Sequence, residues 1–323
     1  MNVAFVSLEA GERLLVDRFL DDILRERSTV SADGFLQDAH VLAQELPKRI
    51  RMEAYRFKLA ESAIALCIKN NPISPNLPPT PSQISGRRNT LDRQEILHVL
   101  YCSLIGEPFA WSSIQNGNLI NDVIPICENA DKPMSSGSTH LFDFHTEDAF
   151  HPWAGDYLGL LCLRNPSRTP TLIACIDDIT LGGESMKLLF ERRFVIGANV
   201  AHDVPVSARR IPVLFGSRSR PYLRINTNVD PQLADDQQAL NAYRELVDQL
   251  REHSKEVVLE PGDCFVLDNL RAAHGRSSYK PEYAGADRWL KRIYITSDLR
   301  KSRRLRVTSE SRLINSQLQV SYE

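Results

Sequence analysis

The sequence predicts an α+β protein, with a mainly helical N-terminal part followed by a β-rich C-terminal part. Up to about residue 106, apolar residues recur every three or four positions, which is the spacing of amphipathic helices. Beyond Phe109, apolar residues instead occur in short runs separated by turn-forming residues, as is typical of strands. The 323 residues, 42% of them hydrophobic, are enough for one large domain or two small ones.

The N-terminal part is expected to contain several helices. Residues 11–69 show the helical spacing of apolar side chains throughout. Residues 70–81 hold five prolines, which no helix tolerates, and are interpreted as an ordered connection across the surface and not as a domain boundary. Another helix is expected over residues 90–106.

The C-terminal part is expected to form strands and one further helix. Residues 235–252 are charged but place apolar side chains on one side, which predicts an amphipathic helix. Runs of apolar and β-branched residues predict the strands, which are expected at residues 158–163, 171–176, 257–259, 264–267 and 292–296.

The composition argues against several classes of protein. The net charge of −2 gives no reason to expect a nucleic-acid or anionic-membrane surface, and no apolar run approaches the roughly 18 residues that a membrane span needs. The first seven residues lack the basic region and the apolar run of a secretory signal. No C-x-x-C pair occurs, so we expect reduced, buried thiols and a cytoplasmic protein. The six cysteines are Cys67, Cys102, Cys127, Cys162, Cys175 and Cys264.

Three residues in the second half of the chain suggest a metal site. His145 and Glu147 are separated by one residue, so in an extended segment both side chains point to the same face. Together with His274 they provide two imidazoles and one carboxylate, the set associated with non-heme Fe(II) oxygenases, which leaves metal positions open. A lone His is more often a surface or core residue, and the six other histidines are interpreted in that way.

Several ordered segments resemble the Fe(II)/2-oxoglutarate-dependent oxygenases and, within them, the clavaminate synthase-like group that hydroxylates free amino acids. The resemblance extends from about residue 77 to about residue 304. The similar segments are His-Thr-Glu-Asp-Ala-Phe (145–150), Asp-Tyr-Leu-Gly-Leu (156–160), Cys-Leu-Arg-Asn (162–165), Pro-Gly-Asp (261–263), Asp-Asn (268–269), His-Gly-Arg (274–276) and Gly-Ala-Asp-Arg (285–288).

The resemblance implies a fold that composition alone does not select, a double-stranded β-helix, or jelly roll, with flanking helices. It implies one oxygenase domain over residues 1–323. Within this domain, residues 1–106 would be mainly helical, residues 107–304 would form the core, and residues 305–323 would be a C-terminal tail. The core would include a lid and a helix at about residues 199–252, where the long segment 199–228 closes over the substrate. The alternative is that this segment is a plain surface loop.

The resemblance also implies the cofactors and the residues that hold them. His145, Glu147 and His274 would be the catalytic Fe(II) ligands, and O2 and 2-oxoglutarate would be consumed. Arg288, which lies 14 residues (288 − 274) after His274, matches the arginine that holds the far carboxylate of 2-oxoglutarate, and Thr171 matches its neighbour. The alternatives are that Arg288 pairs with Asp287 on the surface and that Thr171 is an ordinary strand residue.

Six residues are implied to bind a free amino acid. Gln115 matches a contact to the α-amino group, Glu147 would add its oxygen that does not bind iron, and Arg292 matches a contact to the α-carboxylate. Gln115 as a turn cap and Arg292 as a solvated side chain are the alternatives. The remaining three are the side-chain contacts Asn226, Asn228 and Asp148.

The choice of amino acid is the least determined feature. Relatives that act on basic amino acids carry two acidic residues where this chain has Asn226 and Asn228, so an ammonium or guanidinium group would lose a direct ion pair. L-Lysine, hydroxylated at its 3- or 4-position with release of succinate and CO2, is the first expectation. L-Arginine, L-asparagine and other polar amino acids remain open.

Two other classes of function also have to be considered. A zinc-dependent hydrolase can use two His and one Glu, but it would have no need of Arg288. A non-catalytic jelly-roll binding protein would have no need of either the metal ligands or Arg288. The expected partner is a small amino acid and not a nucleic acid or a membrane, and the sequence predicts no oligomeric state.

Overall fold

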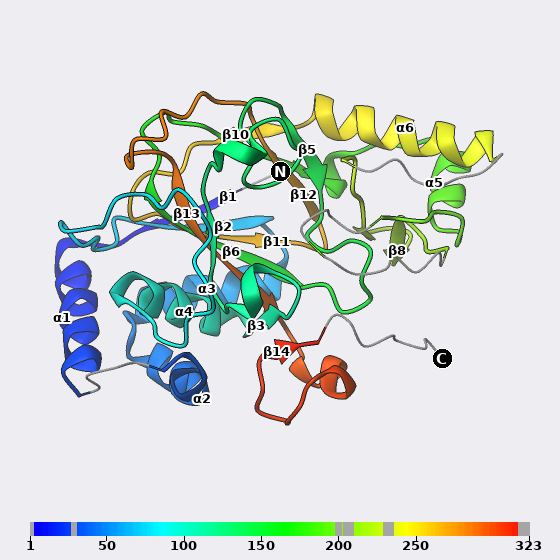
Figure 1. The fold of residues 1–323 in the computed structure, drawn as a ribbon. Helices are drawn as coiled ribbons and strands as arrows, with labels where there is room; N and C mark the ends of the chain where they lie inside the picture. Colours follow the sequence, from blue (N-terminus) through cyan, green and yellow to red (C-terminus); the bar gives the residue numbers. More distant parts are fainter. Residues whose placement is uncertain (1–2, 27–30, 198–201, 203–209, 229–235, 316–323) are drawn as a thin grey trace.

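Helices predominate up to residue 105 and strands predominate after it in the computed structural model, which describes residues 3–26, 31–197, 202, 210–228 and 236–315 (Figure 1). The helices are α1 (Ala10–Glu26), α2 (Ala32–Leu42), α3 (Lys48–Ala60), α4 (Arg93–Ile105), α5 (Gly183–Leu189) and α6 (Gln237–Glu252). Single 3-10 turns occur at Ala43–Glu45, Gln115–Gly117, Cys127–Asn129 and Ile176–Asp178, and a longer 3-10 helix, η5, spans Leu299–Leu305.

The strands belong to three sheets. The larger sheet contains β1 (Val3–Ser7), β2 (Ala65–Lys69), β3 (Glu107–Trp111), β4 (Asn121–Val123), β6 (Tyr157–Arg164), β11 (Cys264–Asp268), β13 (Trp289–Thr296) and β14 (Leu313–Ile314). The smaller sheet contains β5 (Phe142–His145), β7 (Thr171–Cys175), β10 (Lys255–Val257) and β12 (Ala272–Arg276). A separate hairpin contains β8 (Leu214–Gly216) and β9 (Pro221–Leu223).

The order of the strands brings distant parts of the chain together. The larger sheet runs β1-β2-β11-β6-β13-β3-β14, with β4 also paired to β13, and the smaller sheet runs β10-β7-β12-β5. In the larger sheet β13 pairs with β6, which in turn pairs with β11. In the smaller sheet β12 lies between β7 and β5. Most neighbouring strands are therefore far apart in sequence, as expected for a jelly roll.

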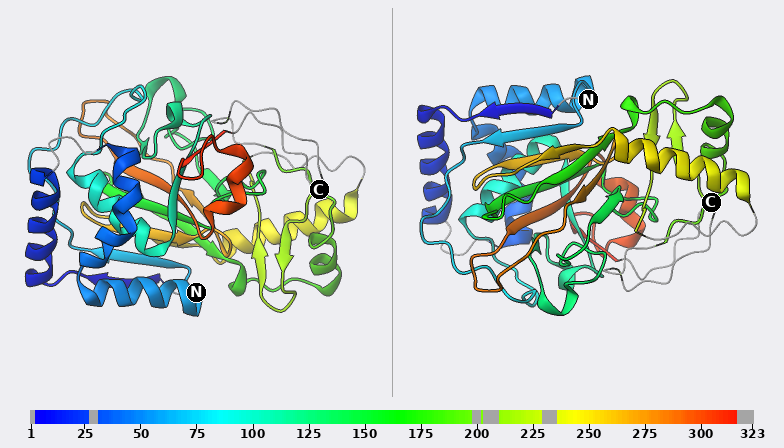
Figure 2. Two further views of the ribbon diagram at one scale, coloured as in Figure 1. Left: turned by 90° about the horizontal axis from the view of Figure 1, so that it is seen from below. Right: turned by 90° about the horizontal axis from the view of Figure 1, so that it is seen from above.

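Three apolar clusters separate four layers. One lies between helices α1–α4 and the outer face of the larger sheet, and a second lies between the two sheets. The third packs the smaller sheet against α5, α6 and the β8–β9 hairpin. The N-terminal helices and the α5–α6 unit accordingly lie at opposite ends of the molecule (Figures 1 and 2).

Most elements expected in the C-terminal part are present. The strands predicted at 158–163, 171–176, 264–267 and 292–296 correspond to β6, β7, β11 and β13. The strand predicted at 257–259 lies slightly earlier, as β10, and the helix predicted at 235–252 is α6. The helix predicted at 90–106 is α4, which begins with a capping box formed by Asp92 and Glu95.

One expectation about the N-terminal part is wrong. Residues 65–69 form β2 and not a helix, because this apolar run is buried between β1 and β11, and periodicity does not distinguish a short buried strand from a helix. Residues 305–315, expected as the start of a C-terminal tail, include β14, which pairs with β3, and Ile314 is buried. Residues 316–323 lie outside the described part.

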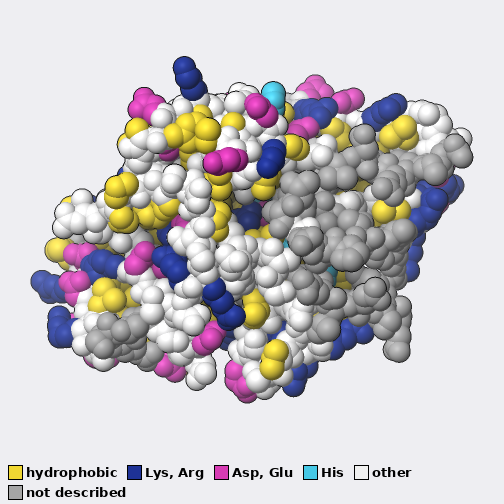
Figure 3. Space-filling view, in the orientation of Figure 1, with side chains coloured by type: hydrophobic (Ala, Val, Ile, Leu, Met, Phe, Trp, Pro, Cys, Tyr) yellow, Lys and Arg dark blue, Asp and Glu magenta, His cyan; other side chains and the backbone are white. Residues whose placement is uncertain are grey.

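The surface charges and the cysteines agree in part with what the composition predicts. Among the described residues, no helix is both long enough and apolar enough to cross a membrane. Basic and acidic side chains are interspersed over the N-terminal helices on the face drawn in Figure 3. All six cysteines are free thiols, and five are buried as expected, but Cys127 is exposed.

A buried ion cluster fastens α4 to the larger sheet. Lys291 of β13 is 1% exposed and lies 2.9 Å from Glu95 of α4 and 2.7 Å from Asp122 of β4. Asp122 also accepts a hydrogen bond from the Trp289 indole, and Arg88 pairs with Glu95. Because side chains alternate along a strand, Lys291 points away from the inter-sheet face to which Arg292 belongs. The cluster therefore holds β13 on the side that faces α4, away from the space between the two sheets.

We expect Lys291→Met to lower the free energy of unfolding by roughly 3–5 kcal/mol, because two buried carboxylates lose their shared cation. Urea unfolding followed by circular dichroism measures this loss. The matched control is Lys187→Met, whose exposed partner Glu184 lies 3.5 Å away, and it should cost less than about 1 kcal/mol. Equal losses in the two variants would contradict a structural role for the cluster.

Candidate metal centre and co-substrate cavity

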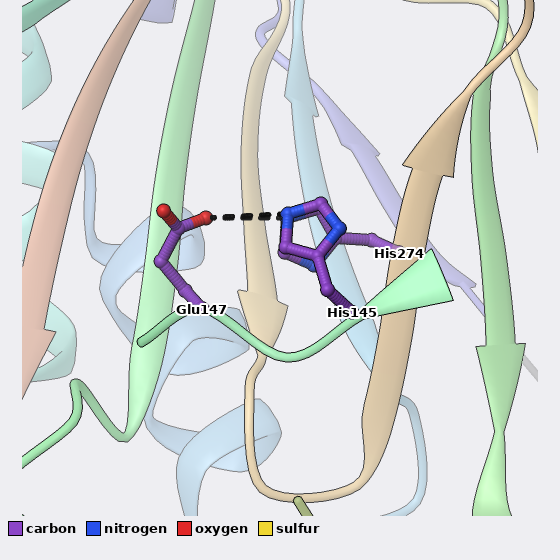
Figure 4. Close-up of side chains that lie close together, drawn as sticks. All are labelled: His145, Glu147 and His274. Carbon is purple, nitrogen blue, oxygen red and sulfur yellow. Dashed lines mark ion pairs between the residues drawn. The ribbon is translucent and has the colours of Figure 1, made fainter. Parts of the chain in front are cut away.

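The pairing of β5 with β12 brings two histidines face to face. His145 ends β5, and His274 lies opposite it in the antiparallel register. Directly opposed residues of an antiparallel pair carry their side chains on the same face of the sheet. Glu147 follows β5 by two residues and turns its carboxylate toward both imidazole rings (Figure 4).

The three side chains form a compact, buried set of donor atoms. The Oε2 of Glu147 lies 3.4 Å from the Nε2 of His274 and 3.9 Å from the Nε2 of His145. All three donor atoms lie within 4.8 Å of one another, and no other such group of His, Cys, Asp or Glu occurs in the described ranges. The set expected from the sequence is therefore assembled by the fold.

His145 and Glu147 are in the protonation states that a metal requires. Burial, followed by the nearby His274, lowers the pKa of His145 to about 4, so its imidazole is neutral at pH 7. Burial alone would favour a protonated Glu147, but the charge of Arg292 and the neighbouring His274 side chain lower its pKa well below the usual value. The Nδ1 of His145 donates to the carbonyl of Asp143 at 2.9 Å, which leaves Nε2 as the donor atom.

An unsatisfied atom supports the presence of a cation. The Oε2 of Glu147 is buried and accepts no hydrogen bond from the described residues. A buried carboxylate oxygen without a donor is costly unless it coordinates a metal. Two imidazoles and one carboxylate suit Fe(II), whereas the absence of thiolates is unlike a typical structural zinc site.

Arg292 fixes the other oxygen of Glu147. Its Nη1 lies 2.9 Å from Oε1, and both side chains are buried. Its Nη2 lies 3.5 Å from the Oδ1 of Asn121, and its guanidinium lies over the ring of Tyr294. Arg292 is therefore not solvated. The oxygen expected to face the substrate ammonium already accepts one hydrogen bond from Arg292 and retains one further lone pair.

A cavity of about 50 Å³, partly open to solvent, extends from the metal ligands between the two sheets. A concave space with a few converging polar groups is the usual form of a small-molecule site. Thr171 of β7 and Arg288, which precedes β13, line it together with Arg276 and Arg292. Glu147 is the one acidic side chain among the lining residues. The cavity therefore carries an excess of positive charge.

Arg288 is a buried cation that lacks an acidic partner. It is 4% exposed, and no carboxylate of the described residues lies within ion-pair distance of its guanidinium. Asp287 instead accepts from the amide of Glu282, so a surface pair between neighbours does not form. Burial lowers the pKa of Arg288, but a guanidinium remains protonated at neutral pH. The site therefore favours an anionic ligand, such as a carboxylate.

Four residues that were expected to contact substrate make other contacts and do not line the cavity. The amide of Gln115 exchanges two hydrogen bonds with the backbone of Asp122, which fits the alternative of a turn cap. Asp148 accepts from Trp111 at 2.6 Å and lies 2.7 Å from the Nε2 of His202. The other two are Asn226 and Asn228.

Asn226 and Asn228 hold the strand that carries His145. Asn228 bonds the backbone amide and carbonyl of Asp143, and this carbonyl also accepts from the His145 ring. Asn226 forms a β-bridge with His145 and accepts from the amide of Asn228. Their carboxamides are thus occupied by the backbone.

Two residues of the site, Arg276 and Asn121, were not predicted from the sequence. Arg276 lines the cavity and bonds backbone carbonyls, including that of His140 at 3.0 Å. Arg276 belongs to the His-Gly-Arg segment that resembles the oxygenase family, so this segment could have indicated its place in the site. Asn121 contacts Arg292, but an isolated Asn in a short strand carries no recognisable signal.

Known proteins resemble the chain over its whole length. Residues 202–294 match the family model described as "Taurine catabolism dioxygenase TauD, TfdA family". The enduracididine beta-hydroxylase of Streptomyces hygroscopicus is 32% identical over 95% of this chain and 98% of the relative. The L-ornithine/L-arginine 3-hydroxylase of Catenulispora acidiphila is 32% identical over 96% and 99%, and an L-lysine 3-hydroxylase of the same organism is 26% identical over 94% and 87%.

Solved structures agree with these relatives. The non-heme iron oxygenase OrfP in complex with Fe and alpha-ketoglutaric acid has a TM-score of 0.89 and 35% identity, and the match covers 96% of this chain and 100% of OrfP. OrfP in complex with Fe, succinate and (3S)-hydroxy-L-Arg also has a TM-score of 0.89, at 34% identity over 98% and 100%. The jelly-roll core expected from the sequence is confirmed.

Replacing His274 with Ala should remove ferrous binding and succinate formation, because two donor atoms do not retain the ion in an open site. Anaerobic titration with ferrous iron measures the first effect. The control is His253→Ala, which changes an exposed histidine and should bind iron normally. Unchanged iron binding in His274→Ala would remove this residue from the metal site.

Replacing Arg288 with Met should leave the melting temperature of the ligand-free protein equal or higher, because an unpaired buried charge is lost. With metal present, 2-oxoglutarate at 100 times its Kd should stabilise the wild type by about 2.7 kcal/mol, but not this variant. Differential scanning fluorimetry measures both effects, and turnover should require far more 2-oxoglutarate. Exposed Arg192→Met is the control, and an unchanged ligand-induced shift in Arg288→Met would contradict the assignment.

Proposed function

The chain belongs to the clavaminate synthase-like Fe(II)/2-oxoglutarate oxygenases of the TauD/TfdA family, and on this premise we propose that it hydroxylates C3 of a free basic L-amino acid of the arginine type. The family assignment makes it a non-heme iron dioxygenase that acts on amino acids and uses Fe(II), 2-oxoglutarate and O2. A zinc hydrolase and a non-catalytic binding protein are thereby excluded. The observation that carries the proposal is the buried His145, Glu147 and His274 set beside the unpaired Arg288.

The protein's own residues supply binding and orientation. When bound, the iron supplies the oxidative chemistry in which 2-oxoglutarate becomes succinate and CO2 and the substrate gains a hydroxyl group. Arg288 would hold the far carboxylate of 2-oxoglutarate by two hydrogen bonds, with the Thr171 hydroxyl on the neighbouring strand. The buried walls of the cavity would keep water from the reacting carbon.

Arg292 would hold the α-carboxylate of the amino acid. It points into the same cavity as Arg288, four residues earlier in the chain, because both positions face the space between the sheets. Its bond to Glu147 would fix the amino-acid backbone relative to the metal. The remaining lone pair of Glu147 Oε1 would accept from the α-ammonium group, with Gln115 as a second contact if its bonds to Asp122 rearrange.

The position and type of substrate are supported by the relatives. The two relatives that are 32% identical are named for β- or 3-hydroxylation, and their substrates are enduracididine, ornithine and arginine. Lysine was the first expectation from the sequence and remains the alternative, since a lysine 3-hydroxylase matches at lower identity. Asn226 and Asn228 bond to the backbone in this structure, so Asp148, which follows Glu147 in the chain, would meet a cationic side chain once its bonds to Trp111 and His202 rearrange.

The organisation and location of the protein belong to the same proposal. A single domain is supported by β1 and β2, which extend the same sheet as the core strands. Residues 199–228 would close over the substrate. Within this segment His202 contacts Asp148, and the β8–β9 hairpin packs on α6. Residues 199–201 and 203–209 lie outside the described part. The six free thiols favour the reducing cytoplasm.

A substrate panel tests the proposal. The iron-loaded protein should convert L-arginine or a close analogue to a product heavier by one oxygen, with one succinate per product, and should act more slowly on L-lysine and L-asparagine. Mass spectrometry with isotope-labelled C3 locates the hydroxyl group. Lysine as the preferred substrate would establish the alternative, and failure to form succinate with any amino acid would reject the proposed function.

A further inference from the structure

Asn269, in the turn between β11 and β12, is connected to the metal ligand Glu147 through its side chain. Its Oδ1 accepts from the Glu147 amide at 2.7 Å, and its Nδ2 donates to the Glu147 carbonyl at 3.1 Å. The Nδ2 also donates to the carbonyl of Gly155 at 2.8 Å. The side chain is 3% exposed, so water does not compete for these bonds.

The backbone of Asn269 adds a fourth bond to the same loop. Its amide donates to the carbonyl of Asp156 at 3.0 Å. Asn269 therefore holds the loop of residues 147–156 at both of its ends. This loop starts with Glu147 and includes Asp148, which adopts a left-handed backbone conformation with φ of 55°. A non-glycine residue at this φ persists only when its surroundings hold it there.

Asn269 also couples the two segments that supply the metal donors. It lies five residues (274 − 269) before His274, on the turn that leads into β12. Glu147 comes from the segment after β5, and its carboxylate must meet both the imidazole of His274 and the guanidinium of Arg292. The Asn269 carboxamide fixes the Glu147 backbone relative to the strand that carries His274.

We propose that Asn269 is a positioning residue that sets the orientation of the Glu147 carboxylate at the metal and thereby couples 2-oxoglutarate consumption to substrate hydroxylation. The inference rests on the proposed function, because it takes Glu147 as a metal ligand. A carboxamide is the group that the site requires, since it both accepts from an amide and donates to two carbonyls. Aspartate at this position has the same shape but donates to neither carbonyl and adds a charge.

The test compares Asn269→Asp with Asn71→Asp. The Asn71 carboxamide is also 3% exposed and also makes three hydrogen bonds, donating to the carbonyls of Ile68 and Gly262 and accepting from Tyr101. None of its partners lines the cavity. Both variants should lose folding stability, but only Asn269→Asp should weaken ferrous binding, by about 10–100-fold, as is usual for residues that orient a metal ligand.

Two further measurements separate positioning from folding. The visible spectrum of bound Co(II) should change in Asn269→Asp but not in Asn71→Asp, because the carboxylate ligand is displaced. The ratio of hydroxylated product to succinate should fall in Asn269→Asp only, since a misplaced ligand leaves co-substrate consumption without product. Unchanged iron affinity, spectrum and product ratio in a folded Asn269→Asp would overturn the inference.

Wild-type protein provides an independent test if Asn269→Asp does not fold. Hydrogen exchange should show residues 147–156 and the turn at Asn269 gaining protection together when ferrous iron binds, whereas the segment around Asn71 should not respond. Protection confined to β5 and β12 would contradict the proposal. A wild-type protein that neither binds iron nor forms succinate would instead reject the proposed function, so the two failures remain distinguishable.

Discussion

The pairing of β5 with β12 is the constraint on which the site depends. It places His145 opposite His274 on the inner face of the smaller sheet, and Glu147 then follows from the same strand end. One residue of slip would turn one histidine to the opposite face, because side chains alternate along a strand. Asn226 and Asn228 bond to the β5 edge, and Asn269 bonds the loop behind it, so the register is fixed from several directions.

The second determinant is the unbalanced charge of the cavity. Arg276, Arg288 and Arg292 face it, but Glu147 is the only acidic lining residue. Arg292 is compensated by Glu147, and Arg276 bonds backbone carbonyls, which leaves Arg288 unpaired among the described residues. A metal ion would give Glu147 a positively charged partner, and two ligands that each carry a carboxylate would do the opposite for Arg288 and Arg292. A buried cation without an acidic partner costs folding stability, and a bound carboxylate would recover this cost.

Strand β13 links this charged interior to the N-terminal helices. Arg292 and Tyr294 face the inter-sheet space, whereas Lys291 faces α4 and pairs with Glu95 and Asp122. Strand β13 thus carries Arg292, with Arg288 directly before it, on the side of the cavity and a buried ion cluster on the other side. Helix α4 therefore supports β13 from the side opposite the cavity.

The sequence by itself predicted the grouping of His145, Glu147 and His274 and the place of Arg288, because ordered motifs resemble a known family. It also predicted five of the C-terminal strands (β6, β7, β10, β11 and β13), because apolar residues recur there in short runs. It did not predict β2 or β14, where pairing with distant strands decided the outcome, and local periodicity carries no information about such pairing. It also could not tell that Asn226, Asn228 and Gln115 bond to the backbone, since a carboxamide suits a ligand and a main-chain group equally well. Only the tertiary structure decided which groups remained unpaired, because that depends on every neighbour in space.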